Sequence, residues 1–209
     1  MKIGILGSGN VGRALAKAFV SEGHEVWLAT REPDGDKGTL LRDEHPGVQV
    51  ANFETVAKEG DIAILATPWD AAADMLKLAG PHHLDYKTVI DTNNAITEHK
   101  GSMRQVLELN NSAGEVVQFW LPRSHVVKCF NTVGAELYYK PDFKEKPTML
   151  LCGNNEDAKK QVSELVQQCG WDPLDAGDLE AARDLESMAV LWVNHVRRTG
   201  DRHHAFRML

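Results

Sequence analysis

Short apolar runs and stretches with helical periodicity alternate along this chain. The run 61–67, DIAILAT, is apolar almost throughout, as expected for a strand buried on both faces. Between such runs, apolar residues recur every three or four positions, for example at Leu185, Met188, Ala189 and Trp192. The strands predicted in this way cover 3–6, 26–29, 48–53, 61–67, 88–91, 126–130, 148–152 and 172–176.

Turn and capping residues delimit the predicted helices. Gly23 ends the first helix, and a capping-box pattern at 112–115 begins another. The other predicted helices cover 38–45, 70–79, 155–168 and 179–198. Alternating strands and helices predict an α/β protein with a Rossmann-type, doubly wound, mostly parallel sheet. We expect residues 1–175 to form a dinucleotide-binding domain. Residues 176–209 form a C-terminal helix and tail that complete the site or make a dimer contact.

A glycine-rich segment lies between the first predicted strand and the first predicted helix. Gly7 allows a tight turn, Gly9 lets the backbone approach a pyrophosphate, and Gly12 lets the helix pack closely on the strand. The pyrophosphate then lies at the helix N-terminus, where free N–H groups favour anions. The segment is Gly7-Ser8-Gly9-Asn10-Val11-Gly12. It predicts a dinucleotide site, with a glycine-rich turn in another α/β protein as the alternative.

The end of the second strand indicates which dinucleotide is bound. NAD sites usually place an acidic residue there, but this chain has Thr30-Arg31. A hydroxyl and a guanidinium suit a 2′-phosphate, and Lys37 adds charge. These residues favour NADP. The alternative is that Glu32 or Asp34 binds the ribose of NAD.

Five segments follow predicted strands and should meet at one crevice, because ligands of such folds bind beyond the carboxyl ends of the strands. They are Gly7–Gly12, Thr30-Arg31, Thr67-Pro68-Trp69, Asp91–Asn94 and Asn131–Gly134.

The composition of the chain argues against several classes of binding partner. The 209 residues are 43% hydrophobic and carry a formal net charge of −7 with no basic run, which argues against nucleic acid and anionic membranes. No apolar stretch approaches the ~20 residues of a membrane span, and the N-terminus lacks a signal-peptide core. Cys129, Cys152 and Cys169 show no CxxC spacing and are expected to be buried free thiols. We expect a cytoplasmic protein.

Residues for proton transfer and metal binding are scarce. The chain has no Ser-x-x-x-Lys or Tyr-x-x-x-Lys pair of the kind that protonates a carbonyl. The pairs His82-His83 and His203-His204 are adjacent in sequence and do not share a helix face, so we predict no metal site. His125 precedes a strand and is expected to be a loop residue. Hydride transfer between two stacked rings needs little proton transfer from protein, and it suits such a site.

The chain resembles the NADP oxidoreductases that depend on coenzyme F420, a deazaflavin. It is also similar to the reductase domain of the six-transmembrane epithelial antigen ferric and cupric reductases. The likeness spans nearly the whole length. It is carried by GSGNVG at 7–12, ATR at 29–31, ATPWDAA at 66–72, VVKCFNTVGA at 126–135 and PLDAGDLEAARDLESM at 173–188.

The resemblance implies a role for each matching position. Residues 8–11 would hold the pyrophosphate, and Thr30 and Arg31 the 2′-phosphate. The nicotinamide and its ribose would lie by Thr67, Pro68 and Asn93. The second ring would stack beside Asn131, Thr132, Val133, Gly134 and Ala135, and the tail 200–209 would close over it.

Departures from the family pattern leave the hydride acceptor open. Arg202, His203, His204 and Phe206 replace small residues in the tail, and Gly134 replaces a proline. F420, FMN and FAD are therefore all candidates. Two other functions remain open: a non-enzymatic NADP(H) sensor, or a reductase of a small carbonyl or imine that uses Asp91, His125 or a water as proton donor.

Apolar residues near the end of the chain predict a homodimer. They are Met188, Trp192, Phe206, Met208 and Leu209. The alternative is that the last helix packs on its own sheet.

Overall fold

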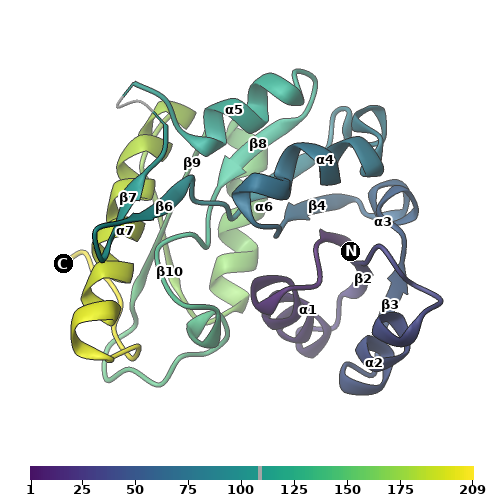
Figure 1. The fold of residues 1–209 in the computed structure, drawn as a ribbon, viewed down its shortest axis with the longest axis horizontal. Helices are drawn as coiled ribbons and strands as arrows, with labels where there is room; N and C mark the ends of the chain where they lie inside the picture. The colour runs from purple at the N-terminus through teal and green to yellow at the C-terminus, as the bar shows by residue number, and fades with distance from the viewer. Residues whose placement is uncertain (108–109) are drawn as a thin grey trace.

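A central sheet organises the protein, which is represented by a computed structural model describing residues 1–107 and 110–209. Within these ranges, eight strands form one sheet with helices on both faces (Figure 1). Neighbouring strands are parallel, except that β8 and β9 are antiparallel. This confirms the predicted α/β class and mostly parallel sheet. In sheet order the strands are β10 (Asp172–Asp175), β9 (Thr148–Gly153), β8 (His125–Lys128), β5 (Thr88–Asp91), β4 (Ile62–Leu65), β1 (Lys2–Leu6), β2 (Glu25–Ala29) and β3 (Val48–Ala51).

Helices cover the sheet on both faces through amphipathic contacts. On one face α1 and α6 bury Leu15, Phe19 and Val162, and on the other α3, α4 and α5 bury residues such as Val56 and Leu76. The helices are α1 (Asn10–Ser21), α2 (Asp36–Glu44), α3 (Phe53–Glu59), α4 (Trp69–Ala79), α5 (Ala113–Trp120), α6 (Glu156–Gln168) and α7 (Ala182–Thr199), with 3-10 turns η1 (Pro81–Leu84), η2 (Ala135–Leu137) and η3 (Leu179–Ala181). None of the helices within the described ranges is long and apolar enough to cross a membrane.

The strand order creates a switch point beside β1. The chain adds β2 and β3 on one side of β1, and then crosses to add β4, β5 and β8 on the other. Connections that leave in opposite directions open a crevice at the carboxyl ends of the two central strands. Those ends are Leu6 and Leu65, which lie opposite each other in register.

The predicted helix caps are present. The Ser112 hydroxyl accepts a hydrogen bond from the Glu115 N–H at 3.1 Å, and the Asn155 side chain accepts one from Ala158 at 2.9 Å. Four predicted strands, at 48–53, 61–67, 126–130 and 172–176, extend past their observed ends. Of these, β4 ends at Leu65 and β10 at Asp175. The 48–53 strand ends at Ala51, because Asn52 caps α3 by accepting from the Thr55 N–H at 2.8 Å. The 126–130 strand ends at Lys128, and Phe130 takes a positive φ of 56° that no strand continues.

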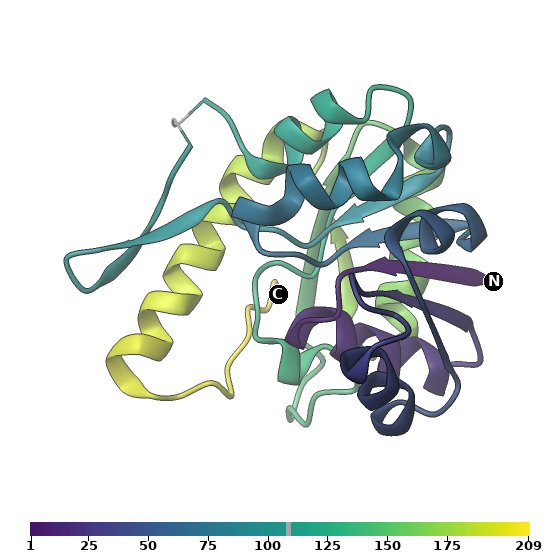
Figure 2. The same ribbon diagram turned by 45° about the vertical axis from the view of Figure 1, so that its right-hand side comes forward.

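The polar segment after β5 forms a hairpin, although none of the strands predicted from the sequence covers it. Strands β6 (Ile96–His99) and β7 (Ser102–Gln105) are antiparallel, and Lys100 and Gly101 between them have positive φ, as in a two-residue hairpin turn. The hairpin stands away from the main sheet beside α7 (Figure 2). The Asn194 side chain of α7 bonds the backbone N–H and C=O of Met103, at 2.7 and 3.0 Å.

Candidate functional site

The glycines of the first turn differ in what surrounds them. Gly7 has a φ of +134°, and a Cβ there would lie 2.3 Å from the Ala66 carbonyl oxygen. A Cβ on Gly12 would lie 1.9 Å from the Gly7 carbonyl oxygen. A Cβ on Gly9 would meet no described atom within 4 Å. The fold therefore requires Gly7 and Gly12, whereas Gly9 faces open space that a ligand can fill.

Helix α1 presents an open N-terminus beside that space. Gly9 is its N-cap residue, and in the described structure no side chain caps the first turn and no acidic residue lies in it. The first N–H groups of the helix have no intrahelical acceptor, and the helix dipole adds positive potential there. The end of α1 can accept an anion.

A cavity of about 280 Å³ extends from this turn past the end of β2. Thr30, Arg31 and Lys37 line it, together with Phe53 and Met75. Thr30 is 2% exposed, and its hydroxyl has no hydrogen-bond partner among the described residues. Arg31 and Lys37 are exposed, and no ion pair with a described carboxylate involves either one. Two cations and a spare hydroxyl thus face one cavity.

A second cavity of about 310 Å³ adjoins the first, and both are lined by Gly9, Ala66, Thr67 and Pro68. It continues along Asn10, Val11, Trp69 and the segment 92–94. The Trp69 ring stacks on Trp120 with centroids 5.6 Å apart and planes 14° from parallel, which fixes one wall. The two cavities form one crevice over the switch point.

Polar atoms of this second cavity also lack partners. The Thr67 hydroxyl and the Asn93 side-chain amide nitrogen are buried without a hydrogen bond to any described residue. Leaving such a group unsatisfied costs about 1–3 kcal/mol, so a ligand or water that bonds them is stabilised. Within the described structure, these two atoms remain available to bond a ligand or a water.

A buried ion cluster lies beneath the segment that carries Asn93, and the sequence pattern did not predict it. Lys128 of β8 lies 2.8 Å from Asp91 of β5 and 2.7 Å from Glu186 of α7, and all three side chains are at most 1% exposed. Lys128 also donates to the Asn93 carbonyl oxygen, and the Asn93 N–H donates to Asp91 at 3.0 Å. The cluster therefore fixes the backbone that carries Asn93. A lysine inside an apolar strand was the available signal.

The carboxylates of the cluster together affect the pKa of Lys128 more than burial does. Burial lowers the pKa of Lys128, but the carboxylates of Asp91 and Glu186 more than offset this, so the pKa lies above its ordinary value. Glu186 also accepts from the N–H groups of Ala113 and Gly114, at 3.1 and 3.3 Å. The lysine is thus held as a cation with its counter-charges satisfied.

The two candidate proton donors do not face the crevice. Asp91 is fully buried in the ion cluster. His125 begins β8, at the end of the sheet opposite the crevice, and lines separate cavities there. Of the described residues that line the crevice, only Arg31 and Lys37 are ionisable.

The segment expected to border a second ring lies behind the crevice. Asn131 is 5% exposed and donates to the Asn94 side chain at 2.9 Å, while the Asn94 amide donates back to the Asn131 carbonyl at 2.9 Å. Ala135 begins η2, which packs against α1. The described residues that line the two cavities include neither Asn131, Gly134 nor Ala135.

The C-terminal tail lies beside that segment without lining the crevice. Arg202 pairs with Glu136, and the Phe206 carbonyl accepts from the Thr148 N–H at 3.0 Å. Phe206 lines another cavity, on α7, whose described lining residues include none of the crevice.

Comparisons with known proteins agree with this geometry. The family model of coenzyme F420-dependent NADP oxidoreductases matches residues 2–95. The crystal structure of a proposed F420-dependent NADP reductase from Arthrobacter sp. FB24 superposes with a TM-score of 0.92 at 30% identity, over 100% of this chain and 99% of that one. The chain belongs to this family.

Two curated proteins that are similar to this chain differ in length. The F420-dependent NADP reductase of Methanocaldococcus jannaschii is 28% identical over 204 residues, covering 92% of this chain and 91% of the relative. Metalloreductase STEAP3 of Rattus norvegicus is 29% identical over 190 residues, covering 90% of this chain and 36% of the relative. The chain thus spans about a third of that metalloreductase and nearly all of the archaeal reductase.

Proposed function

We propose that the protein binds NADP(H) in the crevice and transfers a hydride between it and a flavin or deazaflavin. This proposal rests on Arg31 and Lys37, which have no ion-pair partner among the described residues and lie beside the buried Thr30 hydroxyl, which has no described hydrogen-bond partner. These groups match the charge and hydrogen-bonding capacity of a 2′-phosphate. An adenosine ribose without that phosphate would leave both cations unneutralised.

The rest of the crevice fits the remaining parts of the nucleotide. The open N-terminus of α1, at residues 8–11, would hold the pyrophosphate where Gly9 leaves space. Thr67, Pro68 and Asn93 would contact the nicotinamide and its ribose, with Trp69 as the neighbouring wall. NADPH supplies a hydride from its nicotinamide ring when bound. The chain's own part is to hold that ring, and Lys128 fixes the Asn93 backbone beside it.

The shortage of acids and bases in the crevice supports a ring-to-ring transfer. Reduction of a carbonyl or imine needs a proton donor within hydrogen-bond reach of the substrate. Asp91 and His125 both face elsewhere. Two rings held face to face at near-attack distance need mainly positioning, which this crevice of small and aromatic residues supplies.

We also propose a domain organisation and a cellular location for the protein. Residues 1–175 would form the nucleotide-binding unit, and residues 176–209 would complete the site, through Glu186 of the ion cluster, or make a dimer contact. The three cysteines are buried and free in the described structure, and burial raises the pKa of Cys152 and of Cys169 to about 12. Such inert thiols suit a reducing compartment, so we place the protein in the cytoplasm.

Isotope transfer tests the proposed chemistry. NADPH labelled with deuterium at nicotinamide C4 is mixed with the protein and F420, FMN or FAD in turn. We expect nucleotide oxidation with at least one acceptor, and deuterium on carbon in reduced F420, where it does not exchange with water. Tight NADPH binding without oxidation by any acceptor would instead support a sensor. Oxidation without label in the deazaflavin would contradict direct transfer.

A further inference from the structure

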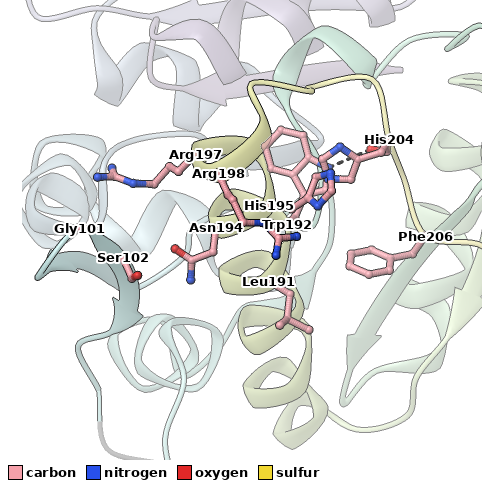
Figure 3. A pocket seen from close by; sticks show the side chains of 10 residues that line it. All are labelled: Gly101, Ser102, Leu191, Trp192, Asn194, His195, Arg197, Arg198, His204 and Phe206. Carbon is pink, nitrogen blue, oxygen red and sulfur yellow. Dashed lines mark hydrogen bonds between the residues drawn. The ribbon is translucent and has the colours of Figure 1, made fainter.

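The end of α7 and the chain beyond it bring three metal-binding side chains together. Gly200 takes a φ of +76° and donates to the Val196 carbonyl at 2.7 Å, which reverses the chain after the helix. The tail then returns along α7 and places Asp201 and His204 beside His195. One ligand atom from each of the three residues lies within 4.8 Å of the others. Figure 3 shows the two imidazoles next to each other at the edge of a cavity.

His204 has no partner for either ring nitrogen in the described structure, although both nitrogens are buried. Its ring is nevertheless held in place. It stacks on Trp192 with centroids 5.0 Å apart, and the Trp192 indole N–H donates to the His204 carbonyl at 2.9 Å. An imidazole that is held in place and has unused ring nitrogens is suited to bind a metal ion.

Asp201 is oriented by the same turn. Its N–H donates to the Thr199 hydroxyl at 3.1 Å, and its Oδ1 accepts from the His203 N–H at 2.8 Å. These bonds hold the carboxylate at the reversal, with Oδ2 left for another contact. His203 itself points elsewhere, stacking on Phe143 and placing Nε2 3.0 Å from the Asp142 carbonyl.

We propose that His195, Asp201 and His204 bind a divalent transition metal ion of the zinc type. Two imidazoles and one carboxylate are common ligands of Zn²⁺, Ni²⁺ and Co²⁺, whereas Mg²⁺ and Ca²⁺ prefer oxygen ligands. Tetrahedral Zn²⁺ sets its ligand atoms about 3.3–3.5 Å apart. Side-chain rotations that bring the ligand atoms closer together by up to about 1.4 Å would close the present separations, which are at most 4.8 Å.

The site has an open side and a structural consequence. The cavity beside it has a volume of about 800 Å³ and is lined by His195 and His204, so it can supply a water as a further ligand. The tail beyond His204 is tied to the sheet by two hydrogen bonds to Thr148, from its N–H to Phe206 and to its hydroxyl from Met208. A bound ion would connect this anchored tail to α7 and stabilise the end of the chain.

Metal titration of the full-length, tag-free protein tests the site. Chelator-treated protein is titrated with ZnCl₂ in competition with a chromophoric indicator, and with CoCl₂ while its visible d–d absorption is recorded. We expect one ion per chain. His195→Gln and His204→Gln should each weaken Zn²⁺ binding at least about tenfold, since loss of even an outer contact of a metal site costs that much. His203→Gln is the matched control and should leave the affinity unchanged.

Folding is controlled by the metal-free melting temperature of each variant. A variant that melts like the parent without zinc, but no longer gains thermal stability from zinc, supports the site even if the affinity assay is weak. Three results would overturn the proposal: no stoichiometric uptake, equal weakening in His203→Gln, or uptake that persists in folded His204→Gln. The last result would assign the ion elsewhere, for example to the adjacent rings of His82 and His83.

Discussion

Replacing Arg31 with glutamate should change nucleotide preference. Arg31 is exposed and forms no ion pair within the described structure, so its loss removes nothing from the folded apo protein. Its contact with a 2′-phosphate would be a charge-assisted hydrogen bond worth about 1.5–3 kcal/mol. That energy corresponds to a loss of roughly 10–100-fold in NADPH affinity, at about 1.4 kcal/mol for each factor of ten. The introduced carboxylate adds repulsion, while Thr30 and Lys37 remain and limit the loss.

The assay compares NADPH with NADH, because the two nucleotides differ only by the 2′-phosphate. Both dissociation constants are measured for the parent and for Arg31→Glu by titration at low and at high salt. We expect NADPH to weaken much more than NADH, with a smaller difference at high salt. Arg104→Glu is the matched control, with the same charge change at an exposed position of β7. Equal weakening of both nucleotides by Arg31→Glu, or no weakening, would refute the assignment of Arg31 to the phosphate.

Three further predictions concern the turn, the ion cluster and assembly. Gly9→Val should fold but lose NADPH binding, whereas Gly12→Val should unfold, because only a Cβ at Gly12 would meet backbone atoms. Circular dichroism checks folding and nucleotide titration checks binding. A folded Gly9→Val variant that binds NADPH normally would contradict the assignment of residues 8–11 to the pyrophosphate. Lys128→Met should cost about 3–5 kcal/mol in urea unfolding, because it leaves two buried carboxylates without a cation, and adding Asp91→Asn and Glu186→Gln should recover part of it. The pKa of Lys128 is raised in the folded protein. Its contribution to the free energy of unfolding is therefore complete below the unfolded pKa of about 10.4 and is lost as the pH rises through the folded pKa. Urea unfolding curves recorded at alkaline pH should show this loss of stability. If the exposed Leu191 lies in a dimer interface, light scattering should give a dimer mass for the parent and a monomer for Leu191→Glu; a monomeric parent would contradict the homodimer.

Local patterns were enough to predict most of the sheet and the phosphate turn. The continuous apolar runs of β1 and β4 and the caps at Ser112 and Asn155 depend on neighbours close in sequence, so they can be read without the fold. The roles of Gly7 and Gly12 follow from turn geometry that any such loop shares. Their predicted close contacts are present.

Features that depend on distant partners were missed. The β6–β7 hairpin has polar residues on both faces, and it is held by Asn194 and Arg197 of α7, about 90 positions along the chain. Lys128 acquires its role only when β5 and α7 supply the carboxylates. Helix α3 was not predicted, because Asn52, which caps it, was assigned to the preceding strand at 48–53.

The histidine pairs show the same limitation. Adjacent His203 and His204 point apart, as expected for neighbours in sequence, whereas the rings of His82 and His83 lie with their centroids 3.8 Å apart. His204 instead meets His195 across the chain reversal at Gly200. Judging metal binding from adjacent residues alone therefore overlooked the one group of potential ligands found among the described residues.

The Lys128 cluster also constrains how this chain can evolve. Losing Lys128 first would leave the Asp91 and Glu186 carboxylates buried without a cation, whereas losing one carboxylate first leaves a balanced pair. An all-apolar version of the cluster can be equally stable, yet every route of single substitutions to it passes through a stage with one unpaired buried charge. The three positions therefore behave as one inherited unit, and variation among descendants of this protein should be concentrated elsewhere, on surfaces where one substitution can be accepted at a time.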